Sequence, residues 1–233
     1  MNIVITGASR GIGKAIAAKF IAAGWNAAIC SLNADRINEA KEKLSALNLQ
    51  AFILAEAFNA GNKSDVLAFA QKIKDNFDKV DVLINNAGIF VPGSIYEEKE
   101  DVLENTMAVN VYGAYHLTKA LLPEMIRRQS GHIFNICSTA SLRAYPNGGS
   151  YSISKFALLG FSKNLREEMK PFGIKVTAVC PGPTLTDSWS GFEGPENRMM
   201  RPEDIADVIW ASYHLSPQTV TEDIILRPIL GDI

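Results

Sequence analysis

Tyr151 and Lys155 form the residue pair with the clearest chemical meaning, because they stand four positions apart in the segment Tyr-Ser-Ile-Ser-Lys. In a helix the phenol and the ammonium lie on one face, about one turn apart. A phenol has an ordinary pKa of about 10, and a positive charge held nearby lowers that pKa until the phenol can exchange protons near neutral pH. The same spacing also fits a surface Tyr–Lys pair, so the neighbouring segments decide between the two interpretations.

Two glycine-containing segments and one serine add to this pair. Thr6-Gly-Ala-Ser-Arg-Gly-Ile-Gly13 has the spacing GxxxGxG. Such glycines permit a tight turn and let a pyrophosphate approach backbone N–H groups at the positive end of a following helix. Asn85-Asn-Ala-Gly88 offers small residues and side-chain amides, and Ser138 precedes Tyr151 by thirteen residues, where its hydroxyl can hold a substrate oxygen or cap a helix. Each segment alone is also an ordinary turn or cap.

The elements that must position these residues are short apolar runs that alternate with segments of helical period. After the first run, Ile12, Ile16 and Phe20 recur every four residues and predict a helix over 11–23. The predicted strands are Asn2–Thr6, Ala27–Cys30, Phe52–Leu54, Val80–Ile84, His132–Cys137, Ile174–Cys180 and Asp223–Leu226. This alternation predicts an α/β fold, a doubly wound three-layer αβα Rossmann sandwich with a seven-stranded parallel sheet. Ligands of such folds bind at the carboxyl ends of the strands.

The 233 residues are 47% hydrophobic and carry 23 basic and 25 acidic side chains, for a formal net charge of −2. This composition predicts one globular domain over 1–233 and excludes a disordered chain or a small disulfide-stapled one. Because Lys and Arg form no cluster, we expect no nucleic-acid partner. Since we find neither an apolar run long enough to span a bilayer nor a recognisable signal peptide, we expect no membrane span and a cytoplasmic location.

The metal-binding and redox residue types show no functional pattern. Cys30, Cys137 and Cys180 stand far apart at the ends of apolar runs, which predicts reduced core thiols. The three histidines have no ligand spacing to one another or to a cysteine, so no metal site is expected.

The segments 6–13, 85–88 and 151–155, together with Asn110, Ser138 and Pro181-Gly182, make nearly the whole sequence resemble the short-chain dehydrogenase/reductase family. This resemblance implies that the catalytic residues are Asn110, Ser138, Tyr151 and Lys155. Tyr151 is then expected to protonate a carbonyl oxygen while a nicotinamide delivers hydride, and Ser138 to hydrogen-bond the same oxygen. Lys155 is expected to bind the nicotinamide ribose and to lower the pKa of Tyr151, and Asn110 to support a water that passes protons to solvent.

The resemblance also implies which residues contact the cofactor. They are Gly7, Ser9, Ile12, Asn59, Asn86, Ala87 and Gly88 on the adenosine and pyrophosphate side, and Tyr151, Lys155, Pro181, Gly182, Thr184 and Thr186 toward the nicotinamide. Ser31 ends the second predicted strand, where a carboxylate would repel a 2′-phosphate, and the Arg10 guanidinium suits such a phosphate. Both features favour NADP(H) over NAD(H). Asn59 stands where the family usually has Asp, and its amide can still bond the adenine.

Substrate choice is expected in the segments 89–96, 141–147 and 183–200. Aromatic and Met side chains in 183–200, namely Trp189, Phe192, Met199 and Met200, suggest a substrate lid, although packing of this segment on its own domain fits equally well. The predicted helices over 102–127 and 150–170 have more apolar positions than one sheet face covers. The resemblance implies that they form the seam of a homodimer or homotetramer, although loops that cover these positions fit the same pattern.

The predicted function is an NADP(H)-dependent oxidoreductase that acts on the carbonyl or alcohol carbon of a small or medium metabolite. The C-terminal residues 201–228 are similar to those of the small-carbonyl, hydroxy-acid and sepiapterin-type reductases of the family. A 3-oxoacyl-thioester reductase of fatty-acid synthesis is therefore the less favoured alternative. A non-catalytic NADP(H)-sensing regulator is a second alternative, and it has no need of an acid–base phenol such as Tyr151.

Overall fold

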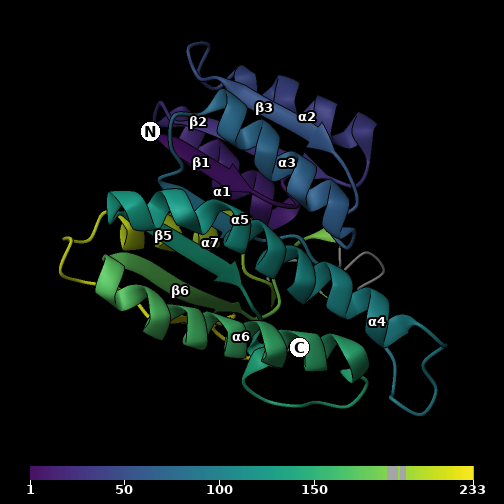
Figure 1. Cartoon of the computed structure of the whole chain (residues 1–233). Coiled ribbons are helices and arrows are strands. Elements are labelled where there is room, and N and C mark those ends of the chain that lie inside the picture. The colour runs from purple at the N-terminus through teal and green to yellow at the C-terminus, as the bar shows by residue number, and fades with distance from the viewer. Residues whose placement is uncertain (188–193, 195–197, 233) are drawn as a thin grey trace.

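Seven parallel strands form one sheet in the order β3-β2-β1-β4-β5-β6-β7 (Figure 1), in a computed structural model that describes residues 1–187, 194 and 198–232. The strands are β1 Asn2–Ile5, β2 Asn26–Ser31, β3 Ile53–Ala57, β4 Val82–Asn85, β5 Gly131–Ile136, β6 Ile174–Pro181 and β7 Asp223–Leu226. The chain winds outward from β1 to β3 and then from β4 to β7 in the opposite direction. This topology confirms the predicted doubly wound sandwich.

Helices cover both faces of the sheet. On one face, α1 (Gly11–Ala22), α2 (Ala34–Ser45) and α7 (Pro202–Tyr213) pack around Ile16, Phe20 and Trp25. On the other, α3 (Lys63–Asn76), α5 (Gly113–Arg128) and α6 (Gly149–Met169) bury Phe69, Leu117 and Leu165, and Figure 1 shows these three helices in front of the sheet. Because helices cover both faces, all four residues of β1 and of β4 are buried, which explains why three consecutive residues of each strand are apolar.

The predicted strand boundaries differ from the observed ones mainly at the edge of the sheet. β3 extends to Ala57, whereas the apolar run predicted only Phe52–Leu54. Its residues 54–56 are only half-buried and Ala57 is exposed, because β3 has a neighbouring strand on one side only. An apolar run therefore underestimates the length of an edge strand. β1 ends at Ile5 rather than Thr6, and β4 begins at Val82 rather than Val80.

The helix predicted over 102–127 is continuous but not uniform. It consists of α4 (Val102–Met107), a π-helical turn at Ala108–Tyr112 and α5. A π-helical turn adds one residue without interrupting the helix, so apolar periodicity does not reveal it. Short 3₁₀ turns at Thr139–Ser141 and Lys170–Phe172 flank α6.

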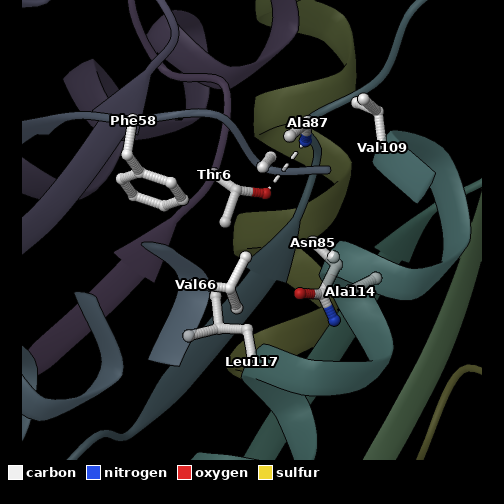
Figure 2. A pocket seen from close by; sticks show the side chains of 10 residues that line it. Thr6, Phe58, Val66, Asn85, Ala87, Val109, Ala114 and Leu117 are labelled. Carbon is white, nitrogen blue, oxygen red and sulfur yellow. Dashed lines mark hydrogen bonds between the residues drawn. The ribbon is translucent and has the colours of Figure 1, made fainter. Parts of the chain in front are cut away.

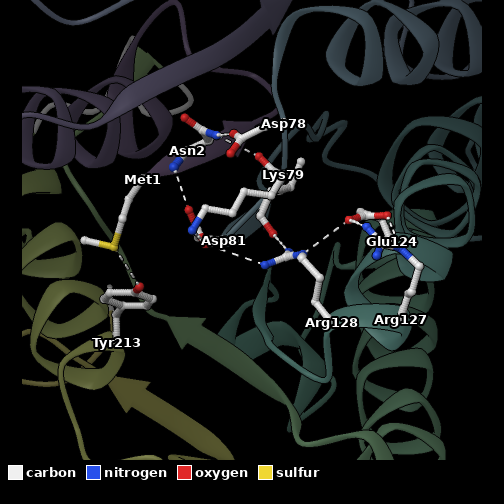
Figure 3. Close-up of polar contacts among 10 residues, drawn as sticks. Met1, Asn2, Asp78, Lys79, Asp81, Glu124, Arg127, Arg128 and Tyr213 are labelled. Carbon is white, nitrogen blue, oxygen red and sulfur yellow. Dashed lines mark hydrogen bonds and ion pairs between the residues drawn. The ribbon is translucent and has the colours of Figure 1, made fainter.

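A polar network ties together the amino ends of β1 and β4 and the end of α5 (Figure 3). The Asp81 carboxylate accepts a 2.8 Å hydrogen bond from the Asn2 backbone N–H and lies 3.2 Å from Lys79 Nζ and 3.8 Å from Arg128 Nη1. Arg128 also donates a 2.6 Å hydrogen bond to the Val80 carbonyl. This network lies at the amino ends of the strands, whereas the motif-bearing segments follow their carboxyl ends. It therefore holds β1, β4 and α5 together away from the candidate site.

Cys30, Cys137 and Cys180 are buried and free, as the sequence predicts. Among the described residues, no group of three or more His, Cys, Asp or Glu could hold a metal ion, and no helix is long and apolar enough to cross a membrane.

Candidate active site

The glycine-rich segment and the Asn85–Gly88 segment meet at the centre of the sheet, where β1 and β4 are neighbours and the direction of winding reverses. The Thr6 hydroxyl accepts hydrogen bonds from the backbone N–H groups of Asn86 at 3.0 Å and Ala87 at 2.9 Å, and Figure 2 draws the second of these. The Asn86 amide donates to the carbonyls of Thr6 and Gly7, both at 2.9 Å. Asn86 therefore positions the glycine-rich loop with both hydrogens of its amide.

Two glycines of this loop are required by packing. Gly7 has φ +67°, and a Cβ there would lie 2.9 Å from Ala87 Cα. A Cβ on Gly13 would lie 2.4 Å from the Gly7 carbonyl oxygen and 2.5 Å from Asn86 Nδ2. Backbone atoms cannot yield that far, so an added methyl group would push α1 away from the loop.

The start of α1 is open to an anion. Among the described residues no side chain caps this helix, and its first turn holds no acidic residue. Ser9 and Ile12 are partly exposed in the same loop and first turn. The first N–H groups of a helix lack partners within it and carry a partial positive charge, so this loop fits the pyrophosphate of a dinucleotide.

Below this loop, a small pocket is lined by Thr6, Phe58, Val66, Asn85, Ala87, Val109, Ala114 and Leu117, among others (Figure 2). The Asn85 amide donates to Thr118 Oγ1 at 2.9 Å and to Asn135 Oδ1 at 2.8 Å, and Asn135 donates to Ser162 Oγ at 2.8 Å. This buried chain of polar groups joins β4, β5, α5 and α6 beneath the loops, so it fixes the elements that carry the candidate catalytic residues relative to one another.

Ser138 and Tyr151 come together at the carboxyl end of β5. Ser138 caps the 3₁₀ turn that follows the strand, and its hydroxyl accepts a 3.1 Å hydrogen bond from the Ala140 N–H. Ser138 is thus a cap as well as a candidate oxyanion donor. Burial raises the pKa of Tyr151, and a hydrogen bond from the Ser138 hydroxyl only partly offsets this effect.

The expectation that Lys155 lowers the pKa of Tyr151 is wrong for this structure. Lys155 Nζ lies 5.7 Å from the centroid of the Tyr151 ring and donates a 2.8 Å hydrogen bond to the Ile136 carbonyl. Burial lowers the pKa of Lys155 and raises that of Tyr151, because removal from water disfavours the charged form of each group. The neighbour that lowers the pKa of Tyr151 in this structure is Ser138 rather than Lys155.

Asn110 lies in the π-helical turn and is 1% exposed. Its amide accepts from the Ile89 N–H at 2.8 Å and donates to the Ile89 carbonyl at 3.0 Å and to Ser154 Oγ at 2.9 Å. A Cβ on Gly88 would lie 3.3 Å from Asn110 Oδ1 and 3.7 Å from Lys155 Nζ. Asn110 therefore anchors the segment after β4 to α6, and Gly88 lies beside both Asn110 and Lys155. π-helical turns are frequent at functional sites.

The residues expected to bind the adenosine half of the cofactor and to choose between NADP(H) and NAD(H) lie at or after the ends of β1, β2 and β3. The Ser31 hydroxyl donates a 3.1 Å hydrogen bond to the Asn33 carbonyl. Ser31 lies next to the glycine-rich loop, because the Ala8 N–H of that loop donates a 2.9 Å hydrogen bond to the Cys30 carbonyl of β2. Arg10 forms an exposed ion pair with Asp187. The exposed Asn59 accepts a 2.9 Å hydrogen bond from the Gly61 N–H and so shapes its own turn.

The residues expected near the nicotinamide follow β6. Pro181 ends this strand, and Gly182 donates a 2.8 Å backbone hydrogen bond to the Leu226 carbonyl. Thr184 is 4% exposed and donates to the Gly182 carbonyl at 2.9 Å. The position that a Cβ on Gly11 would take lies 3.0 Å from Thr186 Cγ2, so Thr186 contacts the glycine-rich loop.

The predicted lid over 183–200 is only partly described. Its two ends pair with each other, since the Leu185 N–H donates to the Met200 carbonyl at 2.8 Å and the Met200 N–H to the Pro183 carbonyl at 3.0 Å. Met199 is buried. Trp189 and Phe192 lie outside the described residues.

Sequence reasoning missed two residues that hold this site. Ser154 is fully buried between the Asn110 amide and the Tyr151 carbonyl, to which it donates a 2.7 Å hydrogen bond. Its place inside the Tyr151–Lys155 motif was the only available signal. Glu98 bonds the start of α6 from a distant segment and had no signal in the sequence.

The geometry agrees with the results of comparison with known proteins. A family profile described as short chain dehydrogenase matches residues 1–196. The chain belongs to this family. This chain is 34% identical to sepiapterin reductase of Chlorobaculum tepidum, over 99% of this chain and 97% of the relative. Family membership confirms the predicted resemblance and makes this protein an oxidoreductase.

Solved structures agree with this assignment. An alcohol dehydrogenase of the archaeon Thermococcus sibiricus, complexed with 5-hydroxy-NADP, superimposes with a TM-score of 0.91 at 26% identity, covering 100% of this chain and 98% of its own. A 7α-hydroxysteroid dehydrogenase complexed with NADH and 7-oxo-glycochenodeoxycholic acid gives a TM-score of 0.89 at 28% identity, covering 99% and 94%. These two neighbours hold different nicotinamide cofactors, so the preference of this short-chain dehydrogenase has to be argued from its own residues.

Proposed function

We propose that this short-chain dehydrogenase transfers hydride between NADP(H) and the carbonyl or alcohol carbon of a small or medium metabolite, with Tyr151 as general acid and base. The observation that carries the proposal is the meeting of three side chains at the carboxyl edge of the sheet. The Ser138 hydroxyl bonds the Tyr151 phenol, and Lys155 Nζ lies 5.7 Å from the ring centroid and 3.7 Å from the position that a Cβ on Gly88 would take. A phenol, a hydroxyl and an ammonium in this arrangement suit proton transfer to a carbonyl oxygen.

The proposed roles follow from these contacts. The bound nicotinamide supplies or accepts the hydride. In reduction, Tyr151 gives its phenolic proton to the carbonyl oxygen, and its raised pKa keeps that proton in place at neutral pH. Ser138 donates a second hydrogen bond to the same oxygen. An ammonium has three donors, and since Lys155 spends one on the Ile136 carbonyl, two remain for the ribose hydroxyls.

Two observations support NADP(H) as the cofactor. Ser31, at the carboxyl end of β2, brings no negative charge to the place where a 2′-phosphate would lie. Arg10 is exposed at the same edge, and a guanidinium can exchange its Asp187 partner for a phosphate. The relative complexed with 5-hydroxy-NADP is consistent with this choice.

Ser31→Asp is expected to lower the ratio of kcat/KM with NADPH to that with NADH by about 10- to 100-fold, since a carboxylate repels a 2′-phosphate and accepts hydrogen bonds from a free 2′-hydroxyl. Steady-state kinetics with both cofactors measures this ratio. Ser130→Asp adds the same charge at the exposed position before β5, at the opposite edge, and should leave the ratio unchanged. An unchanged ratio in Ser31→Asp would remove Ser31 from cofactor choice.

The experiment that tests the proposed function is a substrate panel. The wild-type protein is mixed with NADPH or NADH and with diketones, aldehydes, keto acids and pterins, and cofactor oxidation is followed by absorbance. Pterins belong in the panel because a relative 34% identical to this chain is named sepiapterin reductase. We expect turnover of at least one small carbonyl compound with NADPH. Tight NADPH binding without turnover of any panel compound would favour the regulator instead.

Exposed apolar side chains support the predicted homodimer or homotetramer. Tyr112, which ends the π-helical turn, and Tyr115 on α5 are 52% and 42% exposed, and Ile153 and Phe156 on α6 are 42% and 45% exposed. Contact with a second copy would remove these side chains from water. The oligomeric state stays a prediction, as does the cytoplasmic location.

A further inference from the structure

The first turn of α6, the helix that carries Tyr151 and Lys155, is held by a side chain from a distant segment. Among the described residues next to the helix start, none caps it with a side chain. Instead, Ser150 donates a 2.8 Å hydrogen bond from its backbone N–H to Glu98 Oε1 and another from its hydroxyl to Glu98 Oε2. The first N–H groups of a helix lack partners within it and carry a partial positive charge, so a carboxylate stabilises this end in both respects.

The packing around this contact is tight. Gly149 has φ +37°, and a Cβ there would lie 2.1 Å from Glu98 Oε1 and 2.5 Å from the Gly93 carbonyl oxygen. The Gly93 N–H donates a 3.2 Å hydrogen bond to the Asn147 carbonyl, and Ser150 is 1% exposed. The turn before α6 and the segment after β4 therefore interlock, and neither can move without the other.

The segment after β4 also contacts Tyr151 directly. The Phe90 ring lies edge-on to the Tyr151 ring, with centroids 4.8 Å apart and an interplanar angle of 75°. Residue 89 is fixed by the Asn110 amide and residue 98 by the start of α6. The segment 89–98 is therefore held at both ends and passes beside the Tyr151 ring. At its second end, Glu98 binds Ser150, the residue before Tyr151 on α6.

We propose that Glu98 is a positioning residue, which sets the place of Tyr151 relative to Ser138 and holds the segment 89–96 over the phenol. This inference rests on the proposed function and deepens it. Glu98 touches neither substrate nor cofactor in this proposal; it acts through Ser150. Since misplacement of a reacting group by about 1 Å can cost about 100-fold in rate, the loss of this anchor should reduce turnover although the catalytic side chains remain.

The test compares four variants with the wild type, using NADPH and the panel carbonyl that the wild type reduces fastest. Glu98→Ala removes the anchor, and we expect kcat/KM to fall by about 10- to 100-fold, mainly through kcat. Glu98→Gln keeps an oxygen that can accept from the Ser150 N–H but loses the charge, so it should stay within about fivefold of wild type. Glu100→Ala removes an exposed carboxylate from the same segment and should change kcat/KM less than about twofold. Tyr151→Phe reports whether turnover depends on the phenol.

Two further readouts separate positioning from general damage. The Kd for NADPH, measured by fluorescence titration, should change by less than about fivefold in the Glu98 and Glu100 variants, because most of the expected cofactor contacts lie on elements other than α6. In the reverse oxidation, with NADP+ and the corresponding alcohol, the rise of the rate with pH should shift to higher pH in Glu98→Ala but not in Glu100→Ala, because a displaced phenol loses the Ser138 hydrogen bond that lowers its pKa.

The outcomes are distinct. Equal kcat/KM and pH profiles for Glu98→Ala and Glu100→Ala, with turnover still dependent on Tyr151, would overturn the role of Glu98 and leave the proposed function intact. Undiminished turnover in Tyr151→Phe, or no turnover by the wild type, would overturn the proposed function itself. Should Glu98→Ala fail to fold, Glu98→Gln decides: a loss of kcat/KM of about two- to fivefold with a shifted pH profile supports the anchor, whereas values equal to those of Glu100→Ala in both measurements overturn it.

Discussion

Tyr151→Phe is expected to lower kcat by about 10²- to 10⁴-fold, the usual contribution of a general acid or base. The substitution removes only the hydroxyl, so the edge-on contact with Phe90 at 4.8 Å stays. Lys155 also keeps its hydrogen bond to the Ile136 carbonyl. The Kd for NADPH should therefore change less than about twofold, since Lys155 and the glycine-rich loop keep their expected contacts with the cofactor. Steady-state kinetics and fluorescence titration measure the two quantities.

The matched control is Tyr213→Phe. Tyr213 ends α7 and packs on Trp25 at a centroid distance of 4.9 Å, and its hydroxyl meets Met1. Loss of this hydroxyl should leave kcat unchanged. If Tyr151→Phe kept wild-type turnover, Tyr151 would have no part in proton transfer.

The raised pKa of Tyr151 also predicts the pH dependence of each direction. Reduction needs the protonated phenol, so its rate should be flat across neutral pH. Oxidation needs the phenolate as base, so its rate should rise as the pH increases toward that pKa. The same Tyr151→Phe variant should abolish both profiles.

Acid should destabilise this protein through His132, with the free energy of unfolding falling by about 3 kcal/mol between pH 7 and pH 4 from this residue alone. His132 is 2% exposed at the start of β5, and burial lowers its pKa from 6.5 to about 3. Its Nε2 lies 2.8 Å from Thr177 Oγ1, and its ring stacks on Phe134 with centroids 3.8 Å apart. Since the Thr177 hydroxyl donates to the Thr221 carbonyl at 2.6 Å, it accepts from Nε2, so the neutral ring carries its proton there.

The direction of this pH effect follows from the difference in proton binding between the folded and unfolded states. Below pH 6.5 the unfolded chain binds a proton at His132, while the folded protein does not until the pH approaches about 3. The unfolded state is therefore favoured increasingly as the pH falls from 6.5 toward about 3. Above pH 6.5 the neutral His132 costs the folded protein no stability.

The measurement is urea denaturation of the wild type and His132→Gln at several pH values. Gln keeps an N–H donor for Thr177 but does not titrate, so the variant should lose stability less steeply with acid than the wild type. Acidic side chains such as Glu39, Glu124 and Glu167, whose pKa values are lowered by lysine or arginine neighbours, also contribute to acid destabilisation. They are the same in both proteins and cancel in the difference. If the free energy of unfolding fell with pH in parallel for the two proteins, His132 would not contribute to acid destabilisation.

The sequence by itself determined the fold and the set of chemically important segments. A parallel sheet covered on both faces buries its central strands completely, so the apolar runs Ile3–Ile5 and Val82–Ile84 within β1 and β4 were visible in the sequence. Parallel strands all end at the same edge, so segments that follow different strands had to meet there. The meeting of the 6–13 and 85–88 segments and of Ser138 with Tyr151 was therefore predictable before any contact was known.

Only the tertiary structure decided the electrostatics and the supports of the site. The pKa of Tyr151 is raised, contrary to the prediction from Lys155, because burial depends on every neighbour in space and not on one spacing along a helix. The π-helical turn that holds Asn110 leaves no mark in the apolar pattern. Glu98 and Ser150 are 52 residues apart, and nothing in local periodicity relates them. Contacts of this kind arise when packed elements leave two loops within hydrogen-bonding distance, and that distance is fixed only by the assembled fold.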